Sequence, residues 1–211
     1  MQAYYAVGNR CAVDIASLQL PVALVTALAI LDRKGFAVVD VDLIGLARQC
    51  VGSSQYRRGA KLTEAPAVVD CSGFVKWLYG QRGLWLPRRS IQQRSLGESV
   101  ALDAISGGDL VFVSGCIDYY LDDPNDGVGH VGIATNHRTV IHAANAALGV
   151  VESPLDRFIG KQGFRGARCY LPNDREVLTL LTPPERNVEI ADDIKWIVLQ
   201  SLPQSSSASV V

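Results

Sequence analysis

Cys71 has the clearest nucleophilic potential of any side chain in this sequence of 211 residues. It stands in Asp70-Cys71-Ser72-Gly73, directly before apolar residues at helical spacing, so we expect it at the start of a helix that Gly80 closes. The unpaired backbone N–H groups and the positive dipole of a helix N-terminus are expected to lower the pKa of the thiol and favour the thiolate. Such a cysteine becomes a catalytic nucleophile when a general base lies beside it.

The chain offers three histidines as candidates for this base. His130 lies in the apolar run Gly129-His130-Val131-Gly132-Ile133, and His142 follows twelve positions later in a second β-compatible run. Between them, Asn136-His137-Arg138 has the composition of a hairpin turn, which predicts His137 at an exposed tip. Gly129 and Gly132 are expected to leave room beside His130 for a substrate backbone.

The length of this turn decides whether His130 and His142 can meet. A three-residue loop pairs Thr135 with Thr139 and places both histidines on one face of the sheet, as diagonal neighbours. A two-residue loop places them on opposite faces, and the spacing permits either. If they share a face, His130 takes the proton of Cys71, and His142 hydrogen-bonds the far nitrogen of His130 and orients it.

Each of these residues also has an ordinary structural explanation. A cysteine at a helix start is most often a small buried side chain, and a lone strand histidine is most often a satisfied polar group. The five cysteines are odd in number and show no metal-site spacing, so the other four are interpreted as reduced and structural. Only the combination of Cys71 with two histidines indicates catalysis.

The spacing of apolar residues around these candidates changes along the chain from a helical period to one typical of strands. The helical segments are 43–50, with Asp40 or Asp42 as its cap, 71–80, and 91–96, with Ser90 as its cap. The β-compatible runs are 109–113, 129–135, 139–144 and 163–171. A helical layer followed by an antiparallel sheet predicts an α+β fold.

Composition divides the chain into three parts. Residues 1–39 form an N-terminal extension, in which 25–31 and 36–39 are predicted to make a β-hairpin around Gly35. Residues 40–172 carry Cys71, His130 and His142 and are expected to form the catalytic domain, and 173–211 are expected to form a C-terminal extension with a frayed end at 205–207.

Charge and hydropathy exclude some partners. The net charge is −1, from 20 basic and 21 acidic side chains, so nothing electrostatic favours a nucleic acid or an anionic membrane. The uncharged stretch 15–31 is broken by Pro21 and is short for a membrane span, which needs about 20 apolar residues. Asp14 precedes it, where a signal peptide carries no acid. We therefore expect no membrane span and a cytoplasmic location, with export as the alternative; the oligomeric state stays open.

The acidic stretch at 118–126 is a candidate cation site. It contains four aspartates, but Pro124 and their spacing do not match a calcium-binding loop. We interpret it as a solvated insertion and expect neither a metal nor a cofactor.

Six motifs between residues 40 and 172, taken in order, resemble the NlpC-type cysteine peptidases, papain-like enzymes of bacterial cell-wall metabolism. The motifs are Leu43-Ile44-Gly45-Leu46-Ala47 with Gly52 and Tyr56, Asp70-Cys71-Ser72-Gly73-Phe74-Val75, Leu86-Pro87-Arg88 with Ser90 and Gln93, Gly108-Asp109-Leu110-Val111-Phe112, Gly129-His130-Val131-Gly132-Ile133, and Val140-Ile141-His142-Ala143.

This resemblance implies a papain-like fold, in which N-terminal helices pack on a central antiparallel sheet. It implies that Cys71 is the nucleophile, His130 the base and His142 the orienting residue, and that Tyr56 helps to hold the oxyanion. The substrate contacts that it implies are Asp70, Ser72, Arg88, Ser90 and Gly129. The expected reaction is hydrolysis of an amide bond in a murein stem peptide, after γ-D-glutamyl, through a thioester on Cys71.

The sequence departs from the family pattern beside the expected cleft. Arg58 stands where an aromatic residue is usual, and Ala60 replaces the second glycine after Gly59. Arg57 and Arg58 are interpreted as solvated charges or as contacts for a substrate carboxylate. Two other functions stay open: an enzyme that transfers an acyl or amide group from the same thioester, and a non-catalytic binding module on this fold.

Overall fold

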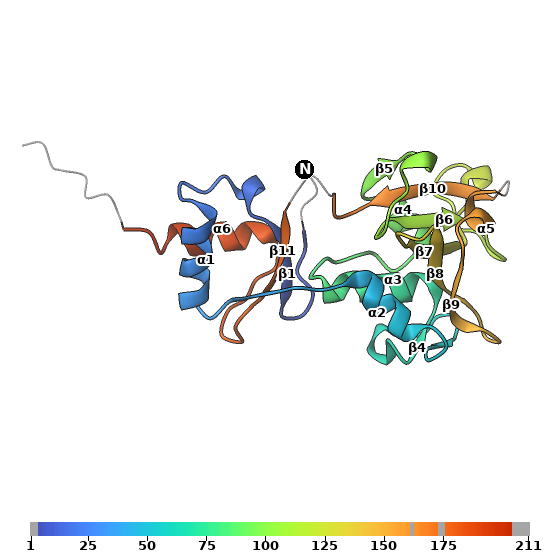
Figure 1. The fold of residues 1–211 in the computed structure, drawn as a ribbon, viewed down its shortest axis with the longest axis horizontal. Coiled ribbons are helices and arrows are strands. Elements are labelled where there is room, and N and C mark those ends of the chain that lie inside the picture. Colours follow the sequence, from blue (N-terminus) through green and yellow to red (C-terminus); the bar gives the residue numbers. More distant parts are fainter. Residues whose placement is uncertain (1–3, 161–162, 173–175, 204–211) are drawn as a thin grey trace, which may run out of the picture.

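The computed structural model describes residues 4–160, 163–172 and 176–203. These residues contain a six-stranded sheet at one end of the molecule, a three-stranded sheet near its middle and a short two-stranded sheet (Figure 1). The larger sheet has six antiparallel strands. In spatial order they are β5 (Glu98–Val100), β10 (Phe164–Cys169), β6 (Leu110–Val113), β7 (His130–Ala134), β8 (Thr139–Asn145) and β9 (Gly149–Pro154).

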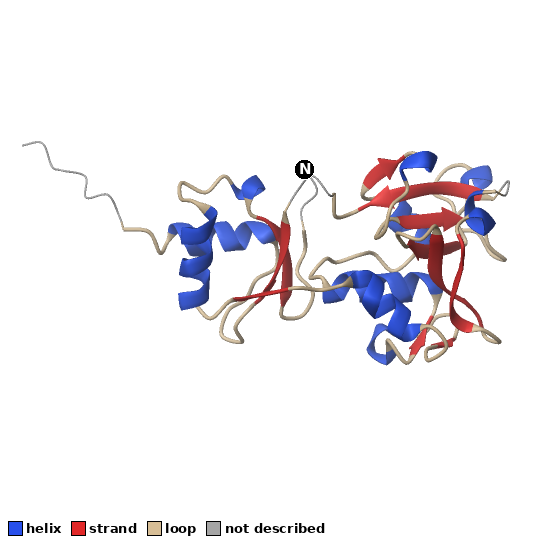
Figure 2. Cartoon of the chain, viewed as in Figure 1, coloured by secondary structure: helices blue, strands red, loops and turns tan. Residues whose placement is uncertain are grey.

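Two helices, α2 (Leu43–Cys50) and α3 (Cys71–Gln81), form the layer beside this sheet (Figure 2). Each begins at an aspartate: Asp42 accepts a hydrogen bond from the backbone N–H of Gly45 at 2.9 Å, and Asp70 accepts one from Gly73 at 2.8 Å. The apolar face of α3 packs into the main core with the inner side chains of β6, β7 and β8. The α+β fold with helices on an antiparallel sheet is confirmed, and of the two caps proposed for α2 the structure uses Asp42.

The β7–β8 hairpin has the three-residue loop. Ile133 pairs with Ile141 and Ala134 with Val140, and the backbone N–H of Thr135 donates to the carbonyl of Thr139 at 2.8 Å. Arg138 closes the loop with φ of +56°, the left-handed conformation that a three-residue hairpin places at this position. The register that puts His130 and His142 on one face is therefore confirmed.

The two extensions combine into one smaller unit. Its three-stranded sheet has the order β1 (Arg10–Asp14), β11 (Val177–Leu181) and β2 (Ala37–Val39). Helices α1 (Leu24–Arg33) and α6 (Ala191–Leu199) bury their apolar residues against it in a second core. No helix in the described part of the chain is both long and apolar enough to cross a bilayer.

The predicted β-hairpin at the N-terminus is wrong. Residues 25–31 belong to α1, and β2 pairs with β11 from the other end of the chain. The segment is apolar at nearly every position, so its pattern fits either structure. Only Ala27, Ile30 and Leu31 are buried, at the spacing of one helix face.

Shorter elements complete the chain. They are β3 (Gln55–Tyr56), β4 (Val68–Val69), α4 (Ser90–Arg94), α5 (Asp156–Ile159) and the 3₁₀ turns Ala16–Leu18, Leu62–Glu64, Leu102–Ala104 and Pro124–Asp126.

The predicted cap of the helix at 91–96 is one residue off. Ser90 is the first residue of α4, and the backbone N–H of Arg89 is satisfied by the side chain of Gln92. α3 runs one residue past Gly80. The frayed end predicted at 205–207 lies outside the described residues.

The smaller unit is attached to the C-terminal end of α3. The guanidinium of Arg82 donates to the carbonyl of Val177 and to the hydroxyl of Thr179, each at 2.7 Å. The backbone N–H of Ala12 donates to the carbonyl of Gly83 at 2.9 Å. Both terminal segments are thus anchored to the helix that carries Cys71.

Replacing Arg82 by alanine is expected to lower the free energy of unfolding by about 2 kcal/mol, because two partly buried acceptors on β11 lose their donor. Urea denaturation of the full chain measures this. Arg138→Ala is the control, because its ion pair with Asp156 is largely exposed and contributes less than about 1 kcal/mol. Equal destabilisation by the two variants would contradict the attachment through Arg82.

Candidate active site

Cys71 is the first residue of α3, and Asp70 fixes where that helix begins. Besides capping Gly73, the Asp70 carboxylate accepts from the backbone N–H of Gly59 at 2.9 Å and pairs with Arg88 at 2.5 Å. These contacts join two loops to the start of the helix. They hold the half-buried Cys71 where its thiol lines the cleft.

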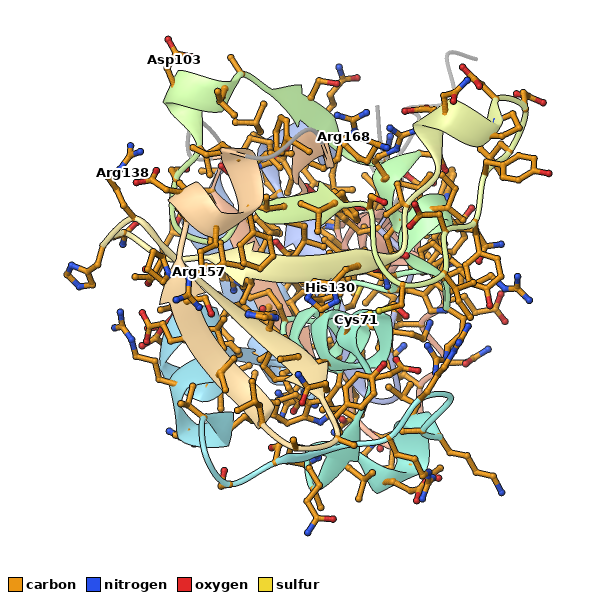
Figure 3. The ribbon with its side chains drawn as sticks, turned by 90° about the vertical axis from the view of Figure 1, so that its right-hand side faces the viewer. Cys71, Asp103, His130, Arg138, Arg157 and Arg168 are labelled. Atoms are coloured by element: carbon orange, nitrogen blue, oxygen red, sulfur yellow. The ribbon has the colours of Figure 1, made fainter. Side chains whose placement is uncertain are left out.

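His130 is the first residue of β7, where it pairs with Val113 of β6. The carbonyl of the preceding residue, Gly129, lies 4.0 Å from the sulfur of Cys71. Figure 3 shows Cys71 and His130 next to one another, one at the helix end and the other at the start of the strand. The structure therefore brings the predicted nucleophile and base together.

His142 contacts the imidazole of His130 in the predicted manner. The Nε2 of His130 lies 2.9 Å from the Nδ1 of His142, and the two rings meet edge to face with centroids 5.0 Å apart. Because Nε2 of His130 is engaged, Nδ1 is the nitrogen left to act on the thiol. If Nδ1 of His130 is the base, it carries no proton, and Nε2–H of His130 then donates to His142.

Ser153 on β9 extends this chain of contacts, and the sequence did not indicate it. Its buried hydroxyl lies 3.1 Å from Nε2 of His142. If Nδ1 of His142 accepts from His130, Nε2 of His142 carries the proton and donates to Ser153. The contact needs the β8–β9 register, in which His142 pairs with Val151, and no turn motif in the sequence predicted it.

Phe158 on α5 is a second residue that the sequence analysis missed. Its ring stacks on His130 with centroids 6.1 Å apart and meets the edge of His142 at 5.0 Å. The aromatic side chain covers both imidazoles and keeps water from one side of the pair.

Burial sets the protonation states of the site. Burial raises the pKa of the Cys71 thiol to about 11, and the nearby Asp70 carboxylate adds to the rise. Burial also lowers the pKa of His130 to about 3 and that of His142 to about 4. The predicted lowering of the thiol pKa is therefore wrong, because loss of solvent outweighs the N–H groups at the helix start. The resting pair is a neutral thiol beside a neutral imidazole.

Tyr56 lies on the same side of the cleft as the thiol. β3 pairs in parallel with β4, and this pairing sets Tyr56 beside Val69, two residues before Cys71. Burial and then the charge of a Cys71 thiolate raise the pKa of the phenol, so its hydroxyl stays protonated at neutral pH. A protonated phenol beside the nucleophile can donate to an oxyanion.

The other residues predicted to contact substrate have structural partners as well. Arg88 donates to Asp70 and to the hydroxyl of Ser72, both at 3.0 Å, and these three side chains line the cleft as one network. The hydroxyl of Ser90, also at the cleft, lies 3.5 Å from the carbonyl of Val128.

Gly129 and Gly132 do not leave open space, as the sequence analysis expected. A Cβ on Gly129 would lie 2.7 Å from the backbone nitrogen of Gly115, and one on Gly132 would lie 2.4 Å from Val140. These positions are small because the protein's own chain packs there. Gly129 still lines the cleft.

The cleft has a volume of about 920 Å³ and is lined by all the residues that the sequence predicted for the site. Among the described residues, no group of three or more histidine, cysteine, aspartate or glutamate side chains could hold a metal ion. The cleft presents the thiol of Cys71, the imidazole of His130 held by His142, and the protonated hydroxyl of Tyr56. This set fits acyl chemistry on a substrate carbonyl.

Comparison with known proteins gives consistent matches. The sequence model of the NlpC/P60 family matches residues 53–168. A probable endopeptidase of Corynebacterium glutamicum is 38% identical over 123 residues, 58% of this chain and 49% of that protein. A gamma-D-glutamyl-L-lysine dipeptidyl-peptidase of Bacillus cereus is 32% identical over 103 residues, 49% of this chain and 29% of that protein. This chain thus aligns with half or less of the length of these two relatives.

Among solved structures, NlpC1 from Trichomonas vaginalis superposes with a TM-score of 0.50 at 21% identity. The match covers 61% of this chain and 42% of that one. At this identity the similarity supports the fold alone.

The neutral histidines make stability depend on pH. Their pKa values in the folded chain lie below the ordinary value of 6.5, so the unfolded chain binds more protons between these values. The stabilisation that the neutral histidines contribute is expected to be complete above pH 6.5. The free energy of unfolding is expected to fall as the pH drops from 6.5 toward about 4. Urea denaturation at pH 7 and pH 5 measures the fall.

His142→Gln should flatten this slope, whereas His137→Gln, at the turn away from the cleft, is the matched control. An unchanged slope in His142→Gln would show that these imidazoles are not held neutral by the fold.

Proposed function

This chain belongs to the NlpC/P60 family, and we propose that it is a cysteine peptidase that hydrolyses amide bonds in murein stem peptides. The observation that carries the proposal is the contact of 2.9 Å between Nε2 of His130 and Nδ1 of His142. It leaves Nδ1 of His130 for the thiol of Cys71 and orients the ring, as catalysis by a thiol–imidazole pair requires.

The reaction begins with a proton transfer. Burial favours the neutral form of both partners, so Nδ1 of His130 takes the thiol proton as Cys71 attacks the carbonyl carbon. The backbone N–H of Cys71, at the first turn of α3, and the hydroxyl of Tyr56 donate to the oxyanion that forms. His130 then passes its proton to the leaving amine, and a thioester remains on Cys71.

Water completes the cycle. His130 is again neutral after the amine departs, and it accepts a proton from the water that attacks the thioester. The bond between the carbonyl carbon and the sulfur then breaks, the acid product leaves, and His130 returns the proton to the sulfur of Cys71. Asp70, Ser72, Arg88 and Ser90 are proposed to contact the substrate from the wall of the cleft that carries Cys71.

The bond is proposed to follow γ-D-glutamyl. Support comes from the Bacillus cereus relative, whose name gives a gamma-D-glutamyl-L-lysine linkage as its substrate. A cytoplasmic location, where the substrate would be a recycled wall fragment, stays a prediction from the N-terminal residues. Fractionation of cells that make the full chain tests it.

Cys71→Ala is expected to lower the rate of hydrolysis of defined muropeptides by about 10⁴-fold or more, because no other group can form the acyl intermediate. Mass spectrometry of the products measures the rate and locates the bond that is cut. Cys169→Ala, which removes a thiol outside the cleft, is the control. Hydrolysis by Cys71→Ala at the wild-type rate would refute the proposed nucleophile.

Ser153→Ala is expected to lower kcat about tenfold with little change in KM, because His142 loses the acceptor that fixes its tautomer. Ser153→Thr keeps the hydroxyl and should recover part of the rate. A rise in KM at unchanged kcat would instead assign Ser153 to substrate binding.

A further inference from the structure

The charge of the cleft differs from that of the whole chain. Its charged lining residues are four arginines and a single aspartate: Arg58, Arg88, Arg89, Arg157 and Asp70. The chain as a whole carries −1. The one aspartate is already paired with Arg88, so the other three arginines give the cleft an excess of positive charge.

These three arginines differ in what they contact. Arg58 donates to the hydroxyl of Tyr119 at 3.4 Å, and Arg89 lies 4.7 Å above the ring of the same tyrosine. Both are therefore held on the wall formed by the loop after β6. Within the described part of the chain, Arg157 has no ion pair or hydrogen bond, and its side chain is exposed to the cleft.

Arg157 nevertheless lies close to His130 and His142. It stands on α5 next to Phe158, whose ring contacts both His130 and His142. Its other neighbour, Asp156, forms an ion pair at 3.3 Å with Arg138, outside the cleft. Figure 3 shows Arg157 on the opposite side of His130 from Cys71.

In the proposed reaction, the leaving half of the substrate lies on the side of the cleft that carries His130. His130 must deliver its proton to the leaving nitrogen, so the leaving half faces the imidazole and the acyl half stays over the thiol. A guanidinium beyond the imidazole therefore faces the leaving half. Among the described residues that line the cleft, no unpaired carboxylate competes for it.

We propose that Arg157 binds a carboxylate on the leaving half of the substrate, an inference that rests on the proposed hydrolysis. The planar guanidinium can donate two parallel hydrogen bonds to a carboxylate, a geometry that lysine does not match. The carboxylate can be the C-terminal one of the leaving residue or one on its side chain. The enzyme thus discriminates among stem peptides by the charge on their leaving residue.

The test uses three peptides that share the acyl half L-Ala-γ-D-Glu. The leaving residue is diaminopimelate, lysine or lysinamide, which removes first the side-chain carboxylate and then the terminal one. We expect kcat/KM to fall about tenfold at one of these two steps, and the step identifies the carboxylate. Arg157→Gln should abolish the difference, and Arg157→Lys should retain a part.

Arg48→Gln is the matched control, because it removes one positive charge from α2, outside the cleft, and should keep the full discrimination. Equal kcat/KM for all three peptides, or full discrimination by Arg157→Gln, would overturn the inference.

Binding to the Cys71→Ala protein, measured by calorimetry with the same peptides, separates the two proposals. If binding to Cys71→Ala depends on the carboxylate but the wild type shows no turnover, the Arg157 subsite is supported and the proposed hydrolysis is refuted. If the wild type turns over the peptides but Cys71→Ala binds all three equally, the hydrolysis is supported and the Arg157 subsite is refuted. Absence of both binding and turnover overturns the two together.

Discussion

The register of one hairpin determines whether the two histidines of the proposed active site can meet. A loop of three residues between β7 and β8 puts His130 and His142 on the same face, with their imidazole nitrogens 2.9 Å apart. A loop shorter by one residue would turn one ring to the other face and separate them. The left-handed conformation of Arg138, at φ of +56°, is the local feature that this loop requires.

The imidazole pair is held in place by burial as much as by hydrogen bonding. Phe158 covers the rings, and the hydroxyl of Ser153 lies 3.1 Å from the outer nitrogen of His142. The same burial favours the neutral forms of both histidines and of the thiol.

The remaining architecture positions the thiol against this pair. Asp70 fixes the first turn of α3 through contacts to Gly73, Gly59 and Arg88. The far end of the helix is tied to β11 through Arg82. Because β11 and β1 come from the two ends of the chain, segments remote from the cleft help to hold the nucleophile's helix.

The sequence by itself determined most of the local elements of the larger unit and singled out Cys71 and His130 as the proposed reactive pair. Helix caps, turn residues and apolar spacing act within a few residues, which is why the start of α3 and the strand of His130 could be predicted. Tertiary structure decided what depends on distant partners: the helical state of residues 25–31, the thiol pKa, and the contacts of Ser153, Phe158 and Arg157 with the site. Those outcomes follow from burial and from strand register, and neither quantity is carried by a short stretch of sequence.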